Sequence, residues 1–288
     1  MKIIVPTNNK GGVGKTKVSM ILAEYFSYIK NKKTLIIDFD PQCNISRKFI
    51  KMEIDPDSPQ GYYPPLHPEY DTDDTSWNGR SSIADIFLGR PVTPYPTFIE
   101  KLDIAPAHAE QLLLAEAVRK TEVVEKVHSR LHDFLSGQEV QNEYEVIIVD
   151  TAPSKGPLTI SAIHAATHVV IPSLMEAQPI QGIYGMMQLW MQESLRRKKG
   201  REIKLVGILP NIFRKTNLHR DMLESLQSNP TISKYIIPTI LWQRVAFAEV
   251  DTDDASPKSL FDLPDGDPAR QEAMEMCKFV ENSVFDGE

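Results

Sequence analysis

Lys10-Gly11-Gly12-Val13-Gly14-Lys15-Thr16 is the stretch of sequence that decides the fold. Residues 2–7 before it predict a short buried strand, and residues 15–30 after it carry apolar side chains at helical spacing. Glycines let backbone N–H groups turn inward around phosphate oxygens, and the positive end of the following helix points at them. The order of strand, glycine-rich turn and helix therefore predicts a phosphate-binding loop, although Lys10 replaces a loop residue and the usual first glycine is absent.

The loop and two strand ends carry side chains suited to a nucleotide. Lys15 is placed to reach the β- and γ-phosphates, and the hydroxyl of Thr16 is placed to bind Mg²⁺. Asp38 and Asp40 stand where the predicted strand 34–38 ends. Phosphoryl transfer needs mainly charge neutralisation and a positioned water, which lysines, Mg²⁺ and a carboxylate supply.

Strand-like and helix-like segments alternate along the rest of the chain. Further strands are predicted at residues 34–38, 102–105, 145–150, 168–171 and 203–209. Further helices are predicted at residues 81–89, 108–135, 180–199, 216–228 and 268–284. This alternation predicts an α/β fold, a mostly parallel twisted sheet with helices on both faces. We expect one domain over residues 1–288, with an acidic inserted loop rich in proline and aromatic residues at about 53–80.

The charge is distributed unevenly over the chain. The net charge is −7, yet residues 53–74 hold seven acidic and no basic residues, and the C-terminal segment 251–288 holds eleven acidic and three basic ones. The rest of the chain carries a net charge of +8. Between positions 196 and 220 there are nine basic residues and one acidic residue. A positive face for nucleic acid is therefore compatible with the acidic average. Part of this basic run is also what the C-terminus of a helix favours.

Cysteine content and hydropathy exclude several classes of protein. Two cysteines, Cys43 and Cys277, cannot form a structural zinc site or hold an iron–sulfur cluster within one chain, and they suit a reducing cytosol. No apolar run approaches the roughly 18 residues that a membrane span needs. We therefore expect a cytoplasmic protein that does not cross a membrane.

Three segments together resemble a known family. Lys10–Thr16 resembles the deviant Walker A motif of the ParA/MinD family of P-loop ATPases. Residues 35–44, with Asp-x-Asp-Pro-Gln at 38–42, resemble the second motif of that family in its ParA partition form. Residues 144–154 resemble its Walker B strand and switch II. The resemblance implies a P-loop NTPase fold of the deviant Walker A class, with ATP and Mg²⁺ as cofactors.

The resemblance also implies roles for single residues. Lys10 corresponds to a signature lysine that crosses a dimer interface to the partner's ATP, and Asp40 corresponds to the carboxylate that positions the attacking water. The implied Mg²⁺ ligands are Thr16, Asp38 and Asp150, of which Asp150 would act through a water. The implied catalytic residues are Lys10, Lys15 and Asp40. The implied nucleotide-binding residues are Gly11, Gly12, Val13, Gly14, Lys15, Thr16, Lys17, Asn211 and Pro238.

Two of these nucleotide contacts carry open alternatives. Lys17 stands where the family usually has a small hydroxyl residue, so it either adds a positive charge at the α-phosphate or points into solvent, which we favour. The amide of Asn211 follows a predicted strand and could pair with an adenine edge, and Pro238 lies where an Ile-Pro segment of the family abuts the base. The alternative for both residues is a purely structural place in a loop.

A ParA-like chain implies an ATP-dependent DNA partition ATPase. Its ATP-bound sandwich dimer would bind DNA without sequence preference, and slow hydrolysis would be stimulated by a ParB-type centromere-binding protein. Further implications are association with the nucleoid and no membrane partner, with higher-order assembly left open. The expected DNA contacts are one local cluster between positions 196 and 220, with Arg244 in addition. The cluster comprises Arg196, Arg197, Lys198, Lys199, Arg201, Arg214, Lys215 and Arg220.

Two alternative functions remain compatible with the motifs. A MinD-like ATPase that positions a partner on a membrane should end in a basic amphipathic helix, whereas residues 274–288 are acidic. A metabolic synthetase of the same P-loop class would carry a small-molecule acceptor site in place of a DNA surface. ATPase assays with and without DNA separate these readings from partition.

Overall fold

The computed structural model describes residues 1–56, 58, 61–73, 77–252 and 258–285. Parts of the two predicted acidic segments lie outside the described residues. These parts are residues 57, 59–60 and 74–76 of the insert, and residues 253–257 and 286–288 of the C-terminal segment.

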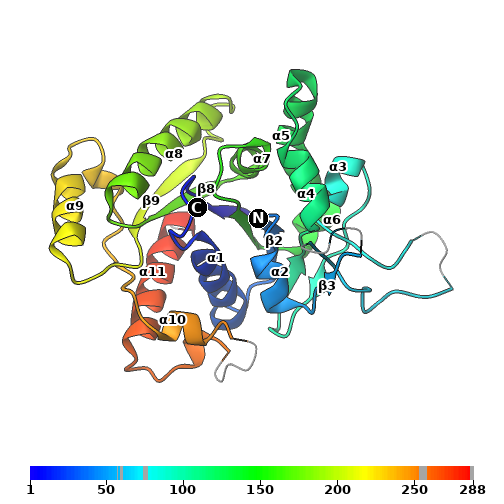
Figure 1. Cartoon of the computed structure of the whole chain (residues 1–288), viewed down its shortest axis with the longest axis horizontal. Helices are drawn as coiled ribbons and strands as arrows, with labels where there is room; N and C mark the ends of the chain where they lie inside the picture. The colour runs from blue at the N-terminus through cyan, green and yellow to red at the C-terminus, as the bar shows by residue number, and fades with distance from the viewer. Residues whose placement is uncertain (57, 59–60, 74–76, 253–257, 286–288) are drawn as a thin grey trace.

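A twisted sheet forms the centre of the molecule (Figure 1). It has seven strands in the order β5-β6-β2-β7-β1-β8-β9. Every neighbouring pair is parallel except β5 with β6. The strands are β1 Lys2–Pro6, β2 Thr34–Phe39, β5 Tyr95–Pro96, β6 Leu102–Ala105, β7 Val146–Thr151, β8 His168–Ser173 and β9 Lys204–Pro210. The predicted mostly parallel α/β sheet is confirmed.

Helices cover both faces of this sheet, as predicted. In Figure 1, α7 and α8 lie on one side of the strands, and α1 and α11 lie on the other. The first group comprises α4 Ala109–Glu116, α5 Thr121–Leu135, α7 Pro157–Ala165, α8 Ala177–Leu195 and α9 Asn217–Ser228. The second comprises α1 Lys15–Glu24, its π-helical continuation Tyr25–Ile29, α2 Asn44–Phe49 and α11 Pro268–Phe285. Short helices are α3 Asp85–Leu88, α6 Gln138–Glu143 and α10 Ala246–Glu249, with 3₁₀ turns at Ser233–Tyr235 and Leu260–Asp262.

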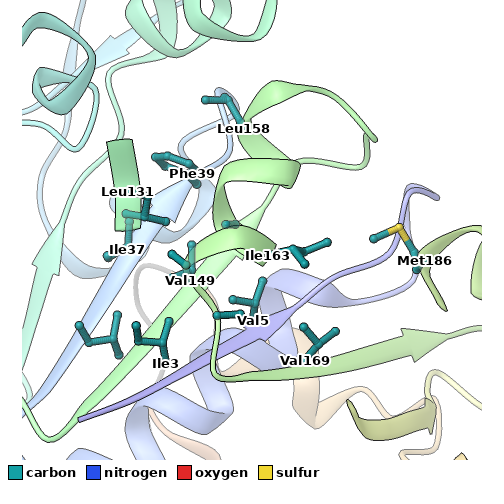
Figure 2. Close-up of a cluster of buried hydrophobic side chains, with 14 of the residues drawn as sticks. Ile3, Val5, Ile37, Phe39, Leu131, Val149, Leu158, Ile163, Val169 and Met186 are labelled. Atoms are coloured by element: carbon teal, nitrogen blue, oxygen red, sulfur yellow. The ribbon is translucent and has the colours of Figure 1, made fainter. Parts of the chain in front are cut away.

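Alternation along the strands builds a hydrophobic core on each face. In β1, Ile3 and Val5 belong to one core and Ile4 to the other, because successive side chains of a strand point to opposite faces. Figure 2 shows the first core, where strand residues meet Leu158 and Ile163 of α7. Strands buried on both faces account for the continuous apolar runs in the sequence.

Two sequence predictions of local structure are wrong. Residues 108–135 form two helices, α4 and α5, with a break at residues 117–120. The insert, predicted as a loop, contains a two-stranded antiparallel hairpin of β3 Glu53–Ile54 and β4 Tyr62–Tyr63. Arg80 holds this hairpin, since its guanidinium lies 2.9 Å from Glu53 and stacks on the Tyr63 ring.

The last helix is part of the core. α11 buries Ala273, Cys277 and Val280, and they pack in the same core as α1. Of the helices in the described ranges, none is long and apolar enough to span a membrane.

Both cysteines are fully buried. Cys277 lies in α11, and Cys43 precedes α2 in a left-handed conformation. Burial raises the pKa of both thiols.

A buried carboxyl group at the end of α1 makes stability depend on pH. Glu24 is 6% exposed and accepts a hydrogen bond of 2.6 Å from the Ser259 hydroxyl. Burial raises the pKa of Glu24 to about 7, against the opposing effects of the Ser259 hydrogen bond and nearby lysines. The pKa of Glu24 is thus higher in the folded than in the unfolded protein. The free energy of unfolding therefore falls as the pH rises from about 4.5 to about 7 and Glu24 loses its proton.

We therefore expect Glu24→Gln to raise the free energy of unfolding at pH 8 by about 2 kcal/mol, and by less than about 1 kcal/mol at pH 5. Urea unfolding at both pH values measures the difference. Glu125→Gln, at an exposed position of α5, is the matched control. An equal gain at both pH values would show that Glu24 is ionised in the folded protein.

Candidate nucleotide site

The predicted phosphate-binding loop connects β1 to α1 and leaves the start of the helix open to an anion. Gly12 and Gly14 adopt left-handed conformations, with φ of 72° and 84°. Gly14 is the N-cap of α1, and no side chain caps the helix there. The first backbone N–H groups of α1 are therefore available to phosphate oxygens, together with the positive end of the helix dipole.

Lys15 lies inside this loop, as predicted. Its ammonium group donates to the carbonyl oxygen of Lys10, 3.2 Å away, and the residue is 6% exposed. Burial lowers the pKa of Lys15, while the charges of Asp150 and Asp40 oppose that shift. The structure thus brings together Lys15 and the two predicted carboxylates.

Asp150 and the α1 hydroxyls form the part of the site that suits Mg²⁺. Thr16 donates to one carboxylate oxygen of Asp150 at 2.8 Å, and Ser19 donates to the other at 2.9 Å. Burial raises the pKa of Asp150 to about 7. No group of three or more His, Cys, Asp or Glu side chains suited to a metal ion occurs in the described part of the chain. Oxygens of Thr16 and Asp150 beside a phosphate cradle fit Mg²⁺, which commonly uses few protein oxygens together with phosphates and waters.

Asp38 is paired in register with Asp150 on the neighbouring strand, but protein groups occupy its carboxylate. One oxygen accepts from the Ser46 backbone N–H at 2.8 Å and from the Ser46 hydroxyl at 2.6 Å, and the other accepts from the Asp40 N–H at 3.2 Å. Burial raises the pKa of Asp38 to about 6. Asp38 therefore fixes the turn into α2, and its contact with Mg²⁺ stays a prediction.

Asp40 keeps one carboxylate oxygen without a protein hydrogen bond within the described ranges. The other accepts from the Gln42 N–H at 3.0 Å, which stabilises the turn before α2. Burial raises the pKa of Asp40, and the nearby charge of Lys15 opposes the shift. The free oxygen could accept a proton or a hydrogen bond from a water.

Asn211 lies behind the loop and holds it in place. Its amide donates to the Val13 carbonyl at 2.8 Å, and its side-chain oxygen accepts from the Ile212 N–H at 2.9 Å. A Cβ atom added at Gly14 would lie 2.2 Å from this amide. Both polar ends of Asn211 are thus used within the protein, and its pairing with adenine stays a prediction. Pro238 is exposed after Ile237, whose N–H bonds to β9 at 2.9 Å, and it also stays a prediction.

The expectation that Lys17 points into solvent is wrong. Its side chain is 19% exposed, and its ammonium group forms an ion pair with Asp251 in the acidic C-terminal segment. Burial lowers the pKa of Lys17, and Asp251 opposes this. The pair ties the start of α1 to the segment after α10. A contact of Lys17 with the α-phosphate stays a prediction.

The basic run from 196 to 220 does not form one cluster, which corrects the sequence interpretation. Arg214 lies 3.6 Å from Glu176, at the start of α8, whereas Arg196 follows its end. A helix of 19 residues is about 28 Å long. We call Arg196, Lys198, Lys199 and Arg201 the amino-edge basic set and Arg214, Lys215 and Arg220 the carboxyl-edge basic set, after the ends of β9 that they flank.

Two other predicted DNA contacts are engaged within the protein. Arg197 donates to the Ala166 carbonyl at 2.9 Å and to the His164 carbonyl, which stabilises the C-terminus of α7. Arg244 forms an ion pair with Glu272 of α11. It nevertheless lines a cleft of about 440 Å³ next to the carboxyl-edge basic set, with Trp242 as a further wall.

Glu116 is a site residue that the sequence interpretation missed. Its carboxylate accepts from the Ser154 hydroxyl at 2.8 Å and from the Leu158 N–H at 3.0 Å. A Cβ atom added at Gly156 would lie 1.8 Å from this carboxylate. Glu116 thus holds the predicted switch II loop to the start of α7. No local pattern indicates this contact, because Glu116 lies 38 residues before Ser154.

Comparison with known proteins agrees with this geometry. A family model described as an AAA domain matches residues 1–204. The sporulation initiation inhibitor protein Soj of Bacillus subtilis is 29% identical over 240 residues, which cover 82% of this chain and 84% of Soj.

Two solved structures share the fold. A putative plasmid partition protein of Borrelia burgdorferi bound to AMPPNP has a TM-score of 0.69 at 18% identity, over 98% of this chain and 99% of that one. Cobyrinic acid a,c-diamide synthase of Mycobacterium smegmatis with ADP and magnesium has a TM-score of 0.59 at 21% identity, over 81% and 83%. Their functions differ, so they bear on the fold alone.

Proposed function

This chain belongs to the ParA-type P-loop ATPases, and from this premise we propose that it is a DNA partition ATPase that hydrolyses ATP to ADP and phosphate. The supporting observation is the convergence of Lys15, Asp40 and Asp150 on an open phosphate-binding loop. Similarity to the chromosome-partitioning ATPase Soj of Thermus thermophilus, 27% identical over 247 residues, favours partition over other uses of the fold.

The site supports a simple division of labour. Backbone N–H groups of the loop and Lys15 would bind the β- and γ-phosphates, and Thr16 and Asp150 would hold Mg²⁺, which neutralises phosphate charge when bound. The free oxygen of Asp40 would orient a water for in-line attack. We find no arginine directed at this site among the residues placed by the structure, so slow basal hydrolysis with stimulation by a ParB-type partner fits the geometry.

We propose that two ATP-bound copies form a sandwich dimer that binds DNA through the carboxyl-edge basic set. This set lies at the edge of the sheet that also carries the nucleotide site, since Arg214 follows β9 just as the phosphate-binding loop follows β1. Dimerisation would then double the phosphate contacts of one face. The amino-edge basic set lies at the opposite edge and would be less affected by ATP.

ATP is expected to convert the chain into a tight DNA binder without sequence preference. Because the affinity falls with log salt at a slope of about −0.9 per phosphate neutralised, doubling the contacts should roughly double that slope. The measurement is a titration of two unrelated fluorescent DNA duplexes with ATP, ADP or no nucleotide, at several salt concentrations.

Two matched triple variants locate the DNA surface. Arg214, Lys215 and Arg220 changed to Gln should remove most of the ATP-dependent increase in slope, whereas Arg196, Lys198 and Lys199 changed to Gln should leave most of it. Nucleotide affinity should stay unchanged in both. Equal DNA binding with ADP and ATP would contradict the proposed function. If the variant at Arg196, Lys198 and Lys199 loses more of the ATP-dependent increase in slope, the amino-edge basic set is the DNA-binding surface.

The structure gives the MinD-like alternative little support. α11 turns Ala269, Ala273, Met276 and Val280 into the core, so its apolar face is already covered. A membrane helix needs that face exposed. The metabolic alternative is tested by the same titration, because a synthetase has no reason to bind DNA in response to ATP.

A further inference from the structure

Two lysines cross one face of α8 next to the phosphate-binding loop. A Cβ atom added at Gly182 would lie 2.9 Å from Cγ of Lys10, and one added at Gly185 would lie 2.2 Å from the Lys155 ammonium group. Residues three apart on a helix are neighbours, roughly 5–6 Å between Cβ positions. The two glycines therefore leave one face of α8 free of side chains, and both lysine side chains lie against that face.

Neither lysine has a counter-charge in the described part of the chain. No ion pair involves Lys10 or Lys155 within residues 1–56, 61–73, 77–252 or 258–285, and Lys155 is exposed. Asn9, which adjoins the Gly182 end of this face, also has a buried side-chain oxygen without a hydrogen-bond partner there. Two lysines on one face of α8 without a counter-charge would both attract an anionic ligand placed there.

The phosphates of the chain's own nucleotide already have their cation. Lys15 occupies the loop of this copy, with its ammonium group against the Lys10 carbonyl. Lys10 and Lys155 instead lie on the α8 side of the loop, outside the cradle formed by residues 11–16. A second anion with several charges, presented from outside, fits them better than the nucleotide bound in the same copy.

We propose that Lys155 joins Lys10 in binding the triphosphate of the nucleotide held by a second copy of this chain. The inference rests on the proposed sandwich dimer. It assigns to Lys155, in the switch II loop, a contact with the partner's triphosphate that would otherwise be made by Lys10 alone. Switch II is held to α7 by Glu116, so Lys155 is presented from an ordered loop.

The test measures two properties of the full chain: its ATP-dependent self-association, and the affinity of the monomer for nucleotide. Lys155→Ala should weaken ATP-dependent dimerisation about tenfold for each nucleotide site, roughly 100-fold for a dimer with two sites, in sedimentation velocity with ATP and Mg²⁺. The affinity for a fluorescent ADP analogue, at concentrations where the chain is monomeric, should stay within about twofold of wild type.

Three further variants make the outcome decisive. Lys155→Arg should keep the charge and most of the dimerisation, and Lys126→Ala, at an exposed position of α5, should behave as wild type. Lys10→Ala should lose dimerisation. Normal dimers with Lys155→Ala but not with Lys10→Ala would overturn the role of Lys155 and leave the proposed function intact, whereas normal dimers with both would overturn the sandwich itself. Weakened ADP binding by Lys155→Ala, or failure of Lys155→Arg, would also overturn the proposal.

Discussion

Replacing Lys15 with alanine is expected to weaken ATP binding by at least about 100-fold, because it removes the buried ammonium group of the phosphate-binding loop. The change also removes the positive charge that now interacts with both Asp40 and Asp150. Titration with a fluorescent ATP analogue, in the presence of Mg²⁺, measures the loss.

The control for this result is Lys126→Ala, which removes a lysine from exposed α5 and should leave ATP binding unchanged. Thermal unfolding without nucleotide should show that the Lys15 variant is folded. An ATP affinity within about threefold of wild type, in a folded variant, would show that phosphate binding is carried by the backbone and not by Lys15.

Replacing Asp40 with asparagine is expected to lower ATP turnover by at least about 100-fold while ATP still binds and still drives dimerisation. Asparagine is the sharper choice than alanine, because its side-chain oxygen can keep the hydrogen bond from the Gln42 N–H. The charge that would orient water is lost, and the turn before α2 is kept. Steady-state phosphate release and sedimentation velocity with ATP measure the two properties separately.

Asp40→Ala is the companion variant, since it removes both the charge and the turn contact. If asparagine retains near wild-type turnover and alanine does not, the role of Asp40 is structural and the water must be oriented elsewhere. If both variants lose ATP binding, Asp40 acts on the nucleotide itself. Only loss of turnover with intact ATP-dependent dimers in both supports the proposed role.

The sheet and the phosphate-binding loop could be predicted because their signals are local. Val146–Thr151 is buried along its whole length, and its sequence is an unbroken apolar run that ends in Asp150 and Thr151. Gly12 and Gly14 adopt left-handed conformations, which glycine allows without a steric penalty and which the tight turn of the predicted loop uses. Such features depend on a few neighbouring residues, and one sequence suffices to find them.

Features that depend on distant contacts were missed. The helical pattern runs from 108 to 135 without a glycine or proline, so it gives no sign of the break after Glu116. That break accompanies the contacts of Glu116 with Ser154 and Leu158. The helix α7 was also missed, although Pro157 at its first position is a typical start signal.

The division of the basic run could have been found from the sequence. A helix ending near Arg196 and a strand beginning near Lys204 place these residues at one edge of the sheet, and Arg214 follows the strand at the other. The predicted strand 203–209 already implied this separation. Residues that are close along the chain here lie at opposite edges of the sheet.

The burial of both thiols has a practical consequence for measuring these predictions. Cys43 and Cys277 are 0% exposed and resist ionisation, so maleimide dyes should react with neither in the folded chain. A single cysteine introduced at an exposed position such as Lys126 would then carry the dye alone. Donor- and acceptor-labelled samples could be mixed to follow association of two copies by energy transfer in real time, without first removing any native residue.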